Sequence, residues 1–179
     1  CDIAALLEAR DPLRAGTETP ADIMTRLDAI ADPGTHDADR GAIRTIRQAA
    51  RQYRARLGIG AETIAAGDPA PLIAAAFPDR LAQRRGEPGS FRLSGGGGAR
   101  LAVTDPLAKA GLLAVAALEM KTSPLIRMAA PLDVADLPAA LAARIKETVE
   151  TSLDPATGSI QARPADRPHP AAPPCGSAA

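Results

Sequence analysis

Apolar side chains recur at helical spacing near the start of the chain. Ile3, Leu6 and Leu7 share one face of a helix that we expect to run through Arg10. Pro12 ends this helix, because the residue before a proline avoids the α region. The chain therefore opens with an amphipathic helix.

A second helix is predicted after a polar link. Thr19 is expected as its N-cap and Pro20 as its first residue, since a proline at that position loses no hydrogen bond. Ile23, Leu27 and Ile30 then form its buried face.

The clearest helix is predicted over residues 40–57, with Gly58 as its C-terminal cap. Its apolar residues fall within an arc of about 80°. They are Ile43, Ile46, Ala50, Tyr53 and Leu57. Arginines fill the adjoining arc, at positions 40, 44, 47, 51 and 54, and no acid lies between Arg40 and Arg56. Shorter helices are expected over residues 61–66 and after Asp68, where Pro78 ends the helical part.

Short extended runs replace helical periodicity after Pro78. A run of four glycines, Gly95–Gly98, separates two of them and predicts a hairpin. The predicted strands are residues 80–85, 90–94, 99–103, 112–118 and 125–130. Helices followed by strands indicate an α+β chain of two units, a helical unit over 1–78 and a small antiparallel β unit over 79–130.

A third section, 131–163, is predicted to contain a helix over 137–145, capped by Asp136, and a hairpin. The hairpin's arms are 146–153 and 159–163, joined by a turn at 154–158. Residues 164–179 are rich in Pro and Ala and lack periodicity, so we expect a disordered tail.

Charge and cysteine usage narrow the class of protein. The chain has 21 basic and 21 acidic residues, which excludes a globally basic nucleic-acid binder. No apolar run approaches the length of about 18 residues of a membrane helix, so no membrane partner is expected. Cys1 and Cys175 lie far apart, offer no metal site and fit a reducing cytoplasm. Because the first residue is Cys and not Met, we expect the chain to be part of a longer protein.

The chain offers little catalytic chemistry. Of its three lysines only Lys121 precedes a threonine, and no glycine near it could shape a phosphate loop, so ATP binding is not expected. The glycines at 95–98 are interpreted as a flexible turn. His36 and His169 lie in a turn and in the tail, apart from any plausible nucleophile. We assign no catalytic residue and no metal ligand.

The arginines are the strongest local signal, and two interpretations remain open for those on the third helix. They form an edge that contacts phosphates, or a solvated face that pairs with the acidic first 39 residues. A second basic group lies on the predicted strands, where only Glu87 opposes it. With few aromatic rings for stacking, contact with the nucleic-acid backbone is favoured over reading of bases. The candidate nucleic-acid-binding residues are Arg44, Arg47, Arg51, Arg54, Arg84, Arg85, Arg92 and Arg100.

Several strings, in order, resemble one family. Residues 76–86 read AFPDRLAQRRG, which is similar to the AYPDRIAQRRG segment of HrpB-type DEAH-box ATP-dependent helicases of bacteria. Residues 91–101, FRLSGGGGARL, resemble that family's next stretch. The resemblance continues at 105–108 (DPLA), 126–132 (IRMAAPL) and 154–158 (DPATG), and it covers roughly residues 1–163.

The resemblance implies a C-terminal, helicase-associated portion of such a helicase, with a helical bundle and an OB-like β-barrel. The motor's phosphate loop, DEAH box and arginine fingers have no counterpart here, so ATP and Mg²⁺ would belong to the RecA-like motor domains of the parent protein. The module would help to form the channel for single-stranded nucleic acid, RNA being expected. A protein-interaction module that braces the motor domains is the alternative, and a free-standing enzyme is a third hypothesis. After residue 163 the chain departs from the family's pattern, for which our hypothesis is a frameshift or truncation.

Overall fold

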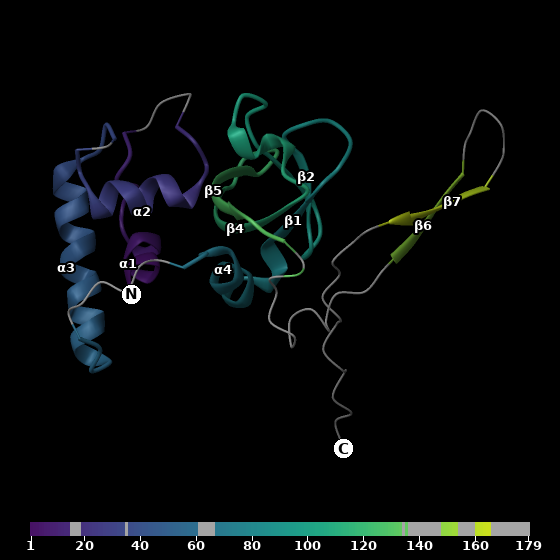
Figure 1. Cartoon of the computed structure of the whole chain (residues 1–179). Helices are drawn as coiled ribbons and strands as arrows, with labels where there is room; N and C mark the ends of the chain where they lie inside the picture. The colour runs from purple at the N-terminus through teal and green to yellow at the C-terminus, as the bar shows by residue number, and fades with distance from the viewer. Residues whose placement is uncertain are drawn as a thin grey trace, which may run out of the picture.

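The computed structural model describes residues 1–14, 19–34, 36–60, 67–133 and 135, together with the backbone of residues 148–153 and 160–165. Its helices precede its strands, and the predicted α+β class is confirmed (Figure 1). The α-helices are α1 (Asp2–Glu8), α2 (Ile23–Ala31), α3 (Arg40–Arg56) and α4 (Ala70–Ala76), and two short 3₁₀ helices are η1 (Pro78–Arg80) and η2 (Pro106–Lys109). The strands are β1 (Leu81–Arg84), β2 (Ser90–Leu93), β3 (Gly98–Arg100), β4 (Leu112–Glu119), β5 (Leu125–Pro131), β6 (Thr148–Leu153) and β7 (Ile160–Ala165).

Strands β1 to β5 form a closed barrel in the order β1-β2-β3-β5-β4. Neighbouring strands are antiparallel except β3 and β5, which meet in parallel where Arg100 lies opposite Leu125. The predicted glycine hairpin joins β2 to β3, with Gly96 and Gly97 at φ angles of 99° and 80°, a conformation that residues with a side chain rarely adopt. Phe91 and Leu113 point into the barrel, where they pack with other buried side chains.

The start of α3 is fixed by a capping carboxylate. Asp39 Oδ1 accepts hydrogen bonds from the amides of Gly41 and Ala42, at 2.7 and 3.1 Å. These amide bonds, the one from Ala42 first, hold the pKa of Asp39 below its ordinary value of 3.8. The predicted helix over residues 40–57 is confirmed to within one residue, and Gly58 follows it with a φ of 65°.

Helix α2 begins later than the sequence predicts. The expected N-cap, Thr19, is wrong, because Asp22 caps the helix instead. The preceding residue is held by the barrel: the Ala21 amide donates to Asp105 at 2.7 Å, and the Ala21 carbonyl accepts from the Ala129 amide at 2.8 Å. These bonds keep the backbone extended up to Asp22, so the helix starts at Ile23.

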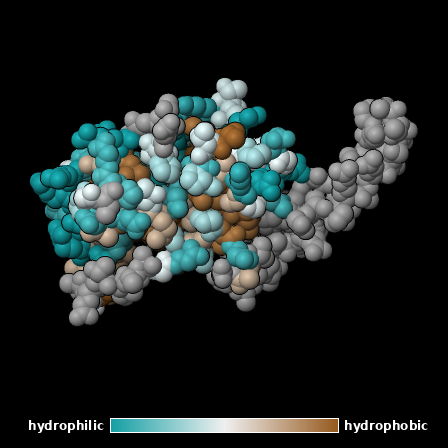
Figure 2. Space-filling view, turned by 45° about the horizontal axis from the view of Figure 1, so that its top comes forward, coloured by the Kyte–Doolittle hydropathy of each residue, from teal (hydrophilic) through white to brown (hydrophobic). Residues whose placement is uncertain are grey.

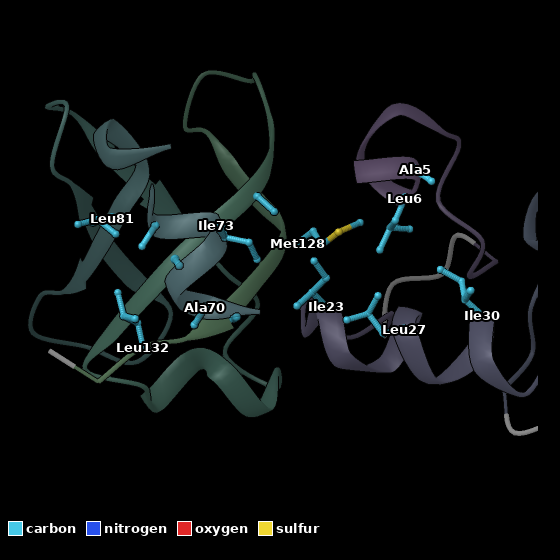
Figure 3. Packing of buried hydrophobic residues seen from close by; sticks show 14 of the residues in the cluster. Ala5, Leu6, Ile23, Leu27, Ile30, Ala70, Ile73, Leu81, Met128 and Leu132 are labelled. Atoms are coloured by element: carbon cyan, nitrogen blue, oxygen red, sulfur yellow. The ribbon is translucent and has the colours of Figure 1, made fainter. Parts of the chain in front are cut away.

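One hydrophobic cluster joins the helices to the barrel. Figure 3 shows Met128 extending from β5 toward Leu6 of α1 and Ile23 of α2. Ile73 of α4 belongs to the same cluster, and α4 packs on β4 and β5. The predicted domain boundary near residue 78 therefore falls between elements that share a core. Whether each side folds independently stays a prediction.

Arg26 of α2 is a charged side chain at this junction, and only 1% of its surface is exposed. Its guanidinium donates to the Asp11 carboxylate at 2.9 and 3.2 Å, and to the carbonyls of Pro20 and of Asp22, the latter at 3.0 Å. A longer bond of 3.4 Å reaches the carbonyl of Arg127 in β5. One side chain thus links the end of the first helical segment, the start of α2 and the barrel.

The predicted C-terminal hairpin is confirmed as β6 paired with β7. Pro164 and Ala165 pair with Val149 and Thr148 of β6, so strand β7 continues to Ala165. The predicted start of the tail at Pro164 is therefore wrong. The predicted helices over 61–66 and 137–145, and the rest of the predicted tail, lie outside the described residues.

Replacing Arg26 by Met should remove the side-chain donor of Asp11 Oδ2 and of three backbone carbonyls. We expect the free energy of unfolding to fall by about 3 kcal/mol, the lower end of the range for breaking a buried ion pair. Urea unfolding followed by circular dichroism measures the change. Arg14→Met is the control, because the Arg14–Asp37 pair is 70% and 79% exposed and should contribute less than about 1 kcal/mol. Equal losses in the two variants would contradict the role of Arg26.

The cap of α3 predicts a dependence on acid. Because folding lowers the pKa of Asp39, its contribution to stability is present above pH 3.8 and is lost as the pH falls through the lower, folded value. Asn also caps helices but does not titrate. Asp39→Asn should therefore unfold less steeply with falling pH than the wild type, whereas Asp39→Ala should be less stable at neutral pH. Identical acid profiles for the wild type and Asp39→Asn would disprove this.

Candidate nucleic-acid interface

Three arginines come together on the outer face of the barrel, on β2, on β3 and at the residue that follows β1. In the strand register Ser90 lies opposite Arg100, and the Arg85 amide donates to the Ser90 carbonyl at 2.8 Å. Arg85, Ser90 and Arg100 therefore form one row across the sheet. Arg92 lies in the next row, opposite Gln83.

The register also sets the spacing of these arginines. Arg92 is a diagonal neighbour of both Arg85 and Arg100, at about 7–8 Å. Arg85 and Arg100 are separated by two strand spacings, or about 10 Å. Phe91 and Ala99, which alternate with Arg92 and Arg100, are buried inside the barrel, so the two arginines face outward. We call Arg85, Arg92 and Arg100 the barrel basic face.

An acidic residue lies at the far end of the same row, but two cations hold it. Leu125 continues the row beyond Arg100, and Glu119 lies opposite Leu125. The Glu119 carboxylate accepts from Lys121 at 2.8 Å and from Arg127 at 2.6 Å. Both bonds, that from Lys121 first, lower the pKa of Glu119. This part of the surface therefore stays net positive.

Arg84 does not belong to the barrel basic face. It is the last residue of β1, directly before Arg85, and lies opposite Phe91, whose ring is inside the barrel. Its guanidinium donates to the carbonyl of Gly86 at 3.1 Å. The structure thus separates two adjacent arginines that the sequence analysis grouped together.

Two of the predicted arginines on α3 hold the helices together. Arg47 donates to the carbonyls of Ile30 and Ala31 at the end of α2, at 2.7 and 2.9 Å. Arg54 forms an ion pair with Asp2 in the first turn of α1. Arg47 thus pairs with carbonyls that the end of α2 leaves without helical partners. Arg54 pairs with a carboxylate in the first turn of α1. The predicted pairing with acidic residues near the chain start is therefore present, at Arg54.

Arg44 and Arg51 lie further around α3 and are exposed. Within the described part of the chain they form no hydrogen bond or ion pair. Helix α3 packs on α1 and α2, and the two helices separate it from the barrel (Figure 1). The structure therefore places the predicted arginines on two separate surfaces, one on α3 and one on the barrel.

A hollow of about 470 Å³ lies at the α2–α3 connection, beside the N-terminus of α3. His36 lines it together with Arg14, Asp37, Asp39 and Arg40. Arg14 pairs with Asp37 at 3.4 Å, and Asp39 caps the helix, so these groups already serve the fold. Among the described residues that line it, the hollow brings together no nucleophile and base.

The described residues contain no cluster of three or more His, Cys, Asp or Glu side chains arranged to bind a metal ion. Their helices are too short or too polar to span a bilayer.

Sequence analysis missed Arg26 and Asp105, which link the helices to the barrel. Arg26 lies between Ile23 and Leu27 on the predicted second helix and carried no signal of its own. The Asp105-Pro106 pair was noted only within a family string, although an acid before a proline is typical of the cap that it forms for Leu107 at 2.8 Å.

Comparison with known proteins finds ATP-dependent RNA helicase HrpB of Escherichia coli (strain K12), which is 30% identical over 169 residues. The match covers 89% of this chain and 20% of that protein. No family model matches the chain.

Two crystal structures of E. coli HrpB share the fold. One, described as a DExH-box NTPase, has a TM-score of 0.63 at 26% identity, and the other, a DEAH/RHA helicase, has 0.64 at 24%. Each alignment covers 97% of this chain and 21% of the other. The chain thus spans about a fifth of these relatives. The resemblance to HrpB-type helicases is confirmed: the chain is homologous to one region of HrpB.

Arg47 bonds to α2 whereas Arg44 is exposed, so replacing each should affect stability differently. Arg47→Gln should lose the bonds to two α2 carbonyls and lower the free energy of unfolding by about 1–2 kcal/mol. Arg44→Gln, three residues away on the same helix, should stay within about 0.5 kcal/mol of the wild type. Urea unfolding distinguishes them. A larger loss for Arg44→Gln would show that the assignment is reversed.

Proposed function

We propose that the chain is an accessory region of an HrpB-type ATP-dependent helicase and contacts a nucleic-acid backbone through the barrel basic face. The observation that carries the proposal is the row of Arg85, Ser90 and Arg100, with Arg92 diagonal to both cations. Guanidinium groups at this spacing can each bind a phosphate oxygen, and the serine hydroxyl can add a hydrogen bond. Homology to a region of an RNA helicase favours RNA as the ligand.

The architecture of the barrel supports this assignment. Five strands close with β5 between β3 and β4, an arrangement consistent with an OB-like barrel. OB-folds bind oligonucleotides on the face of their second and third strands, and here β2 and β3 carry Arg92 and Arg100. Phe91 points inward, so this face lacks its ring for stacking, and contacts with phosphates fit better than contacts with bases.

Catalysis would reside elsewhere in the parent protein. RecA-like motor domains would bind ATP and Mg²⁺ and would be the covalent neighbours of this region. In that setting the chain positions the strand while the motor moves it. The cytoplasmic location expected from the cysteines is part of the same proposal.

A bracing role is the second candidate, and exposed apolar side chains favour it. Leu57 after α3 and Leu72 of α4 are 67% and 64% exposed. Large exposed apolar groups often mark contacts with another protein surface. Leu72→Ser should leave nucleic-acid binding unchanged under either role, so it does not distinguish the two roles. Replacing the barrel arginines does distinguish them, because only the nucleic-acid role depends on those side chains.

The test is fluorescence anisotropy of labelled oligouridylate with the full chain over a salt series. The wild type should bind weakly, at about 10⁻⁴–10⁻⁶ M, with a log–log salt slope of about −0.7 for each phosphate contacted. Arg92→Glu with Arg100→Glu should weaken binding and make the slope shallower by about 1.4.

Arg84→Glu with Lys109→Glu is the control for this test. It makes the same change in net charge but lies off the barrel basic face, because Arg84 is on the other face of β1 and Lys109 ends η2. Its effect should be clearly smaller. Equal losses in the two variants, or wild-type binding that ignores salt, would favour the bracing role.

A further inference from the structure

The exposed arginines of α3 form a straight row that the fold does not use. Arg40, Arg44 and Arg51 fall within an arc of about 40° when each residue turns the helix by 100°. With a rise of 1.5 Å per residue, the row is about 16 Å long. All three side chains are exposed, whereas Arg47 and Arg54, closer to the buried face, bind α2 and α1.

This row is electrostatically unfavourable for the isolated chain. Arg40 and Arg44 are like charges four residues apart, a pairing that destabilises a helix by about 0.2–0.5 kcal/mol. Both lie near the N-terminus of α3, where the helix dipole disfavours cations. No Asp or Glu occurs within α3. The end of the molecule where α3 lies is largely hydrophilic in the visible face (Figure 2).

Among the residues that the structure describes, none relieves the repulsion along the row. Arg44 and Arg51 form no ion pair within the described part of the chain, and Arg40 lies at the hollow where Asp37 is paired with Arg14 and Asp39 caps the helix. A linear set of cations that the fold neither neutralises nor buries is matched by an extended polyanion. A single phosphate or carboxylate would contact only one of the three.

We infer that the Arg40–Arg44–Arg51 row is a second contact for the phosphate backbone of a nucleic acid, separate from the barrel basic face. The inference rests on the proposed function, because it assumes that a nucleic acid is bound at all. It goes further in dividing the interface into two surfaces on either side of α1 and α2. The α3 row adds affinity that depends on salt and not on base sequence.

The experiment compares two variants with the same change in net charge. Arg44→Gln with Arg51→Gln removes two positive charges from the row. Thr45→Glu with Gln52→Glu adds two negative charges at the same seven-residue spacing, one position further round the same helix. Thr45 and Gln52 are exposed, and this variant gives up only the hydrogen bond from the Thr45 hydroxyl to the Gly41 carbonyl. Urea unfolding first establishes that both variants are folded.

Binding of labelled oligouridylate is then measured over the salt series. The arginine variant should bind more weakly and its log–log salt slope should be shallower by about 1.4, because it no longer binds two of the phosphates. The control should keep the wild-type slope, because its three arginines still bind their phosphates. Equal slopes for the arginine variant and the wild type would overturn the inference.

Other outcomes separate this inference from the proposed function. If the arginine variant matches the wild type while Arg92→Glu with Arg100→Glu weakens binding, only the α3 row is refuted. If the wild type does not bind oligouridylate, the proposed function fails first. If the arginine variant loses binding to a labelled polyglutamate peptide but not to oligouridylate, the row recognises an acidic protein segment and the inference is wrong.

Discussion

The buried guanidinium of Arg26 sets the geometry on which the rest of the molecule depends. Burial of an unpaired cation would cost several kcal/mol, so its acceptors must be in place when the chain is folded. They come from Asp11, from the backbone at Pro20 and Asp22, and from β5 at Arg127. The segment after α1, the start of α2 and β5 thus all supply acceptors to this one side chain.

The backbone beside Arg26 carries the same constraint into the barrel. The Ala129 amide donates to the Ala21 carbonyl and Asp22 forms an isolated parallel bridge with Ala129, so the chain before α2 lies beside β5. Met128 then packs against Leu6 and Ile23. Polar and apolar contacts thus join the helices to β5 along the same line of contact.

Local signals in the sequence predicted the elements well. The period of α3, the glycines of the β2–β3 hairpin and the apolar run of β4 each report on their own neighbourhood, and the structure contains all three. The start of α2 was missed because Thr19-Pro20 is a good local cap, whereas the bonds from Ala21 to Asp105 and Ala129 join residues remote in sequence. The burial of Arg26 was missed for the same reason, since a lone arginine on an amphipathic helix has no local mark of its acceptors.

The candidate site shows why arginine counts alone are a weak guide. Of 21 basic residues 18 are Arg, so some must serve packing. Periodicity placed Arg44, Arg47, Arg51 and Arg54 on one stripe, but a shift of about 60° around the helix decides whether a guanidinium meets another helix or water. In the extended chain of the barrel, successive side chains point to opposite faces, so Arg84 and Arg85 are directed to different sides. The informative quantity is therefore each arginine's angle to the buried face. The functional hypothesis rests on the arginines that the packing of helices and strands leaves directed outward.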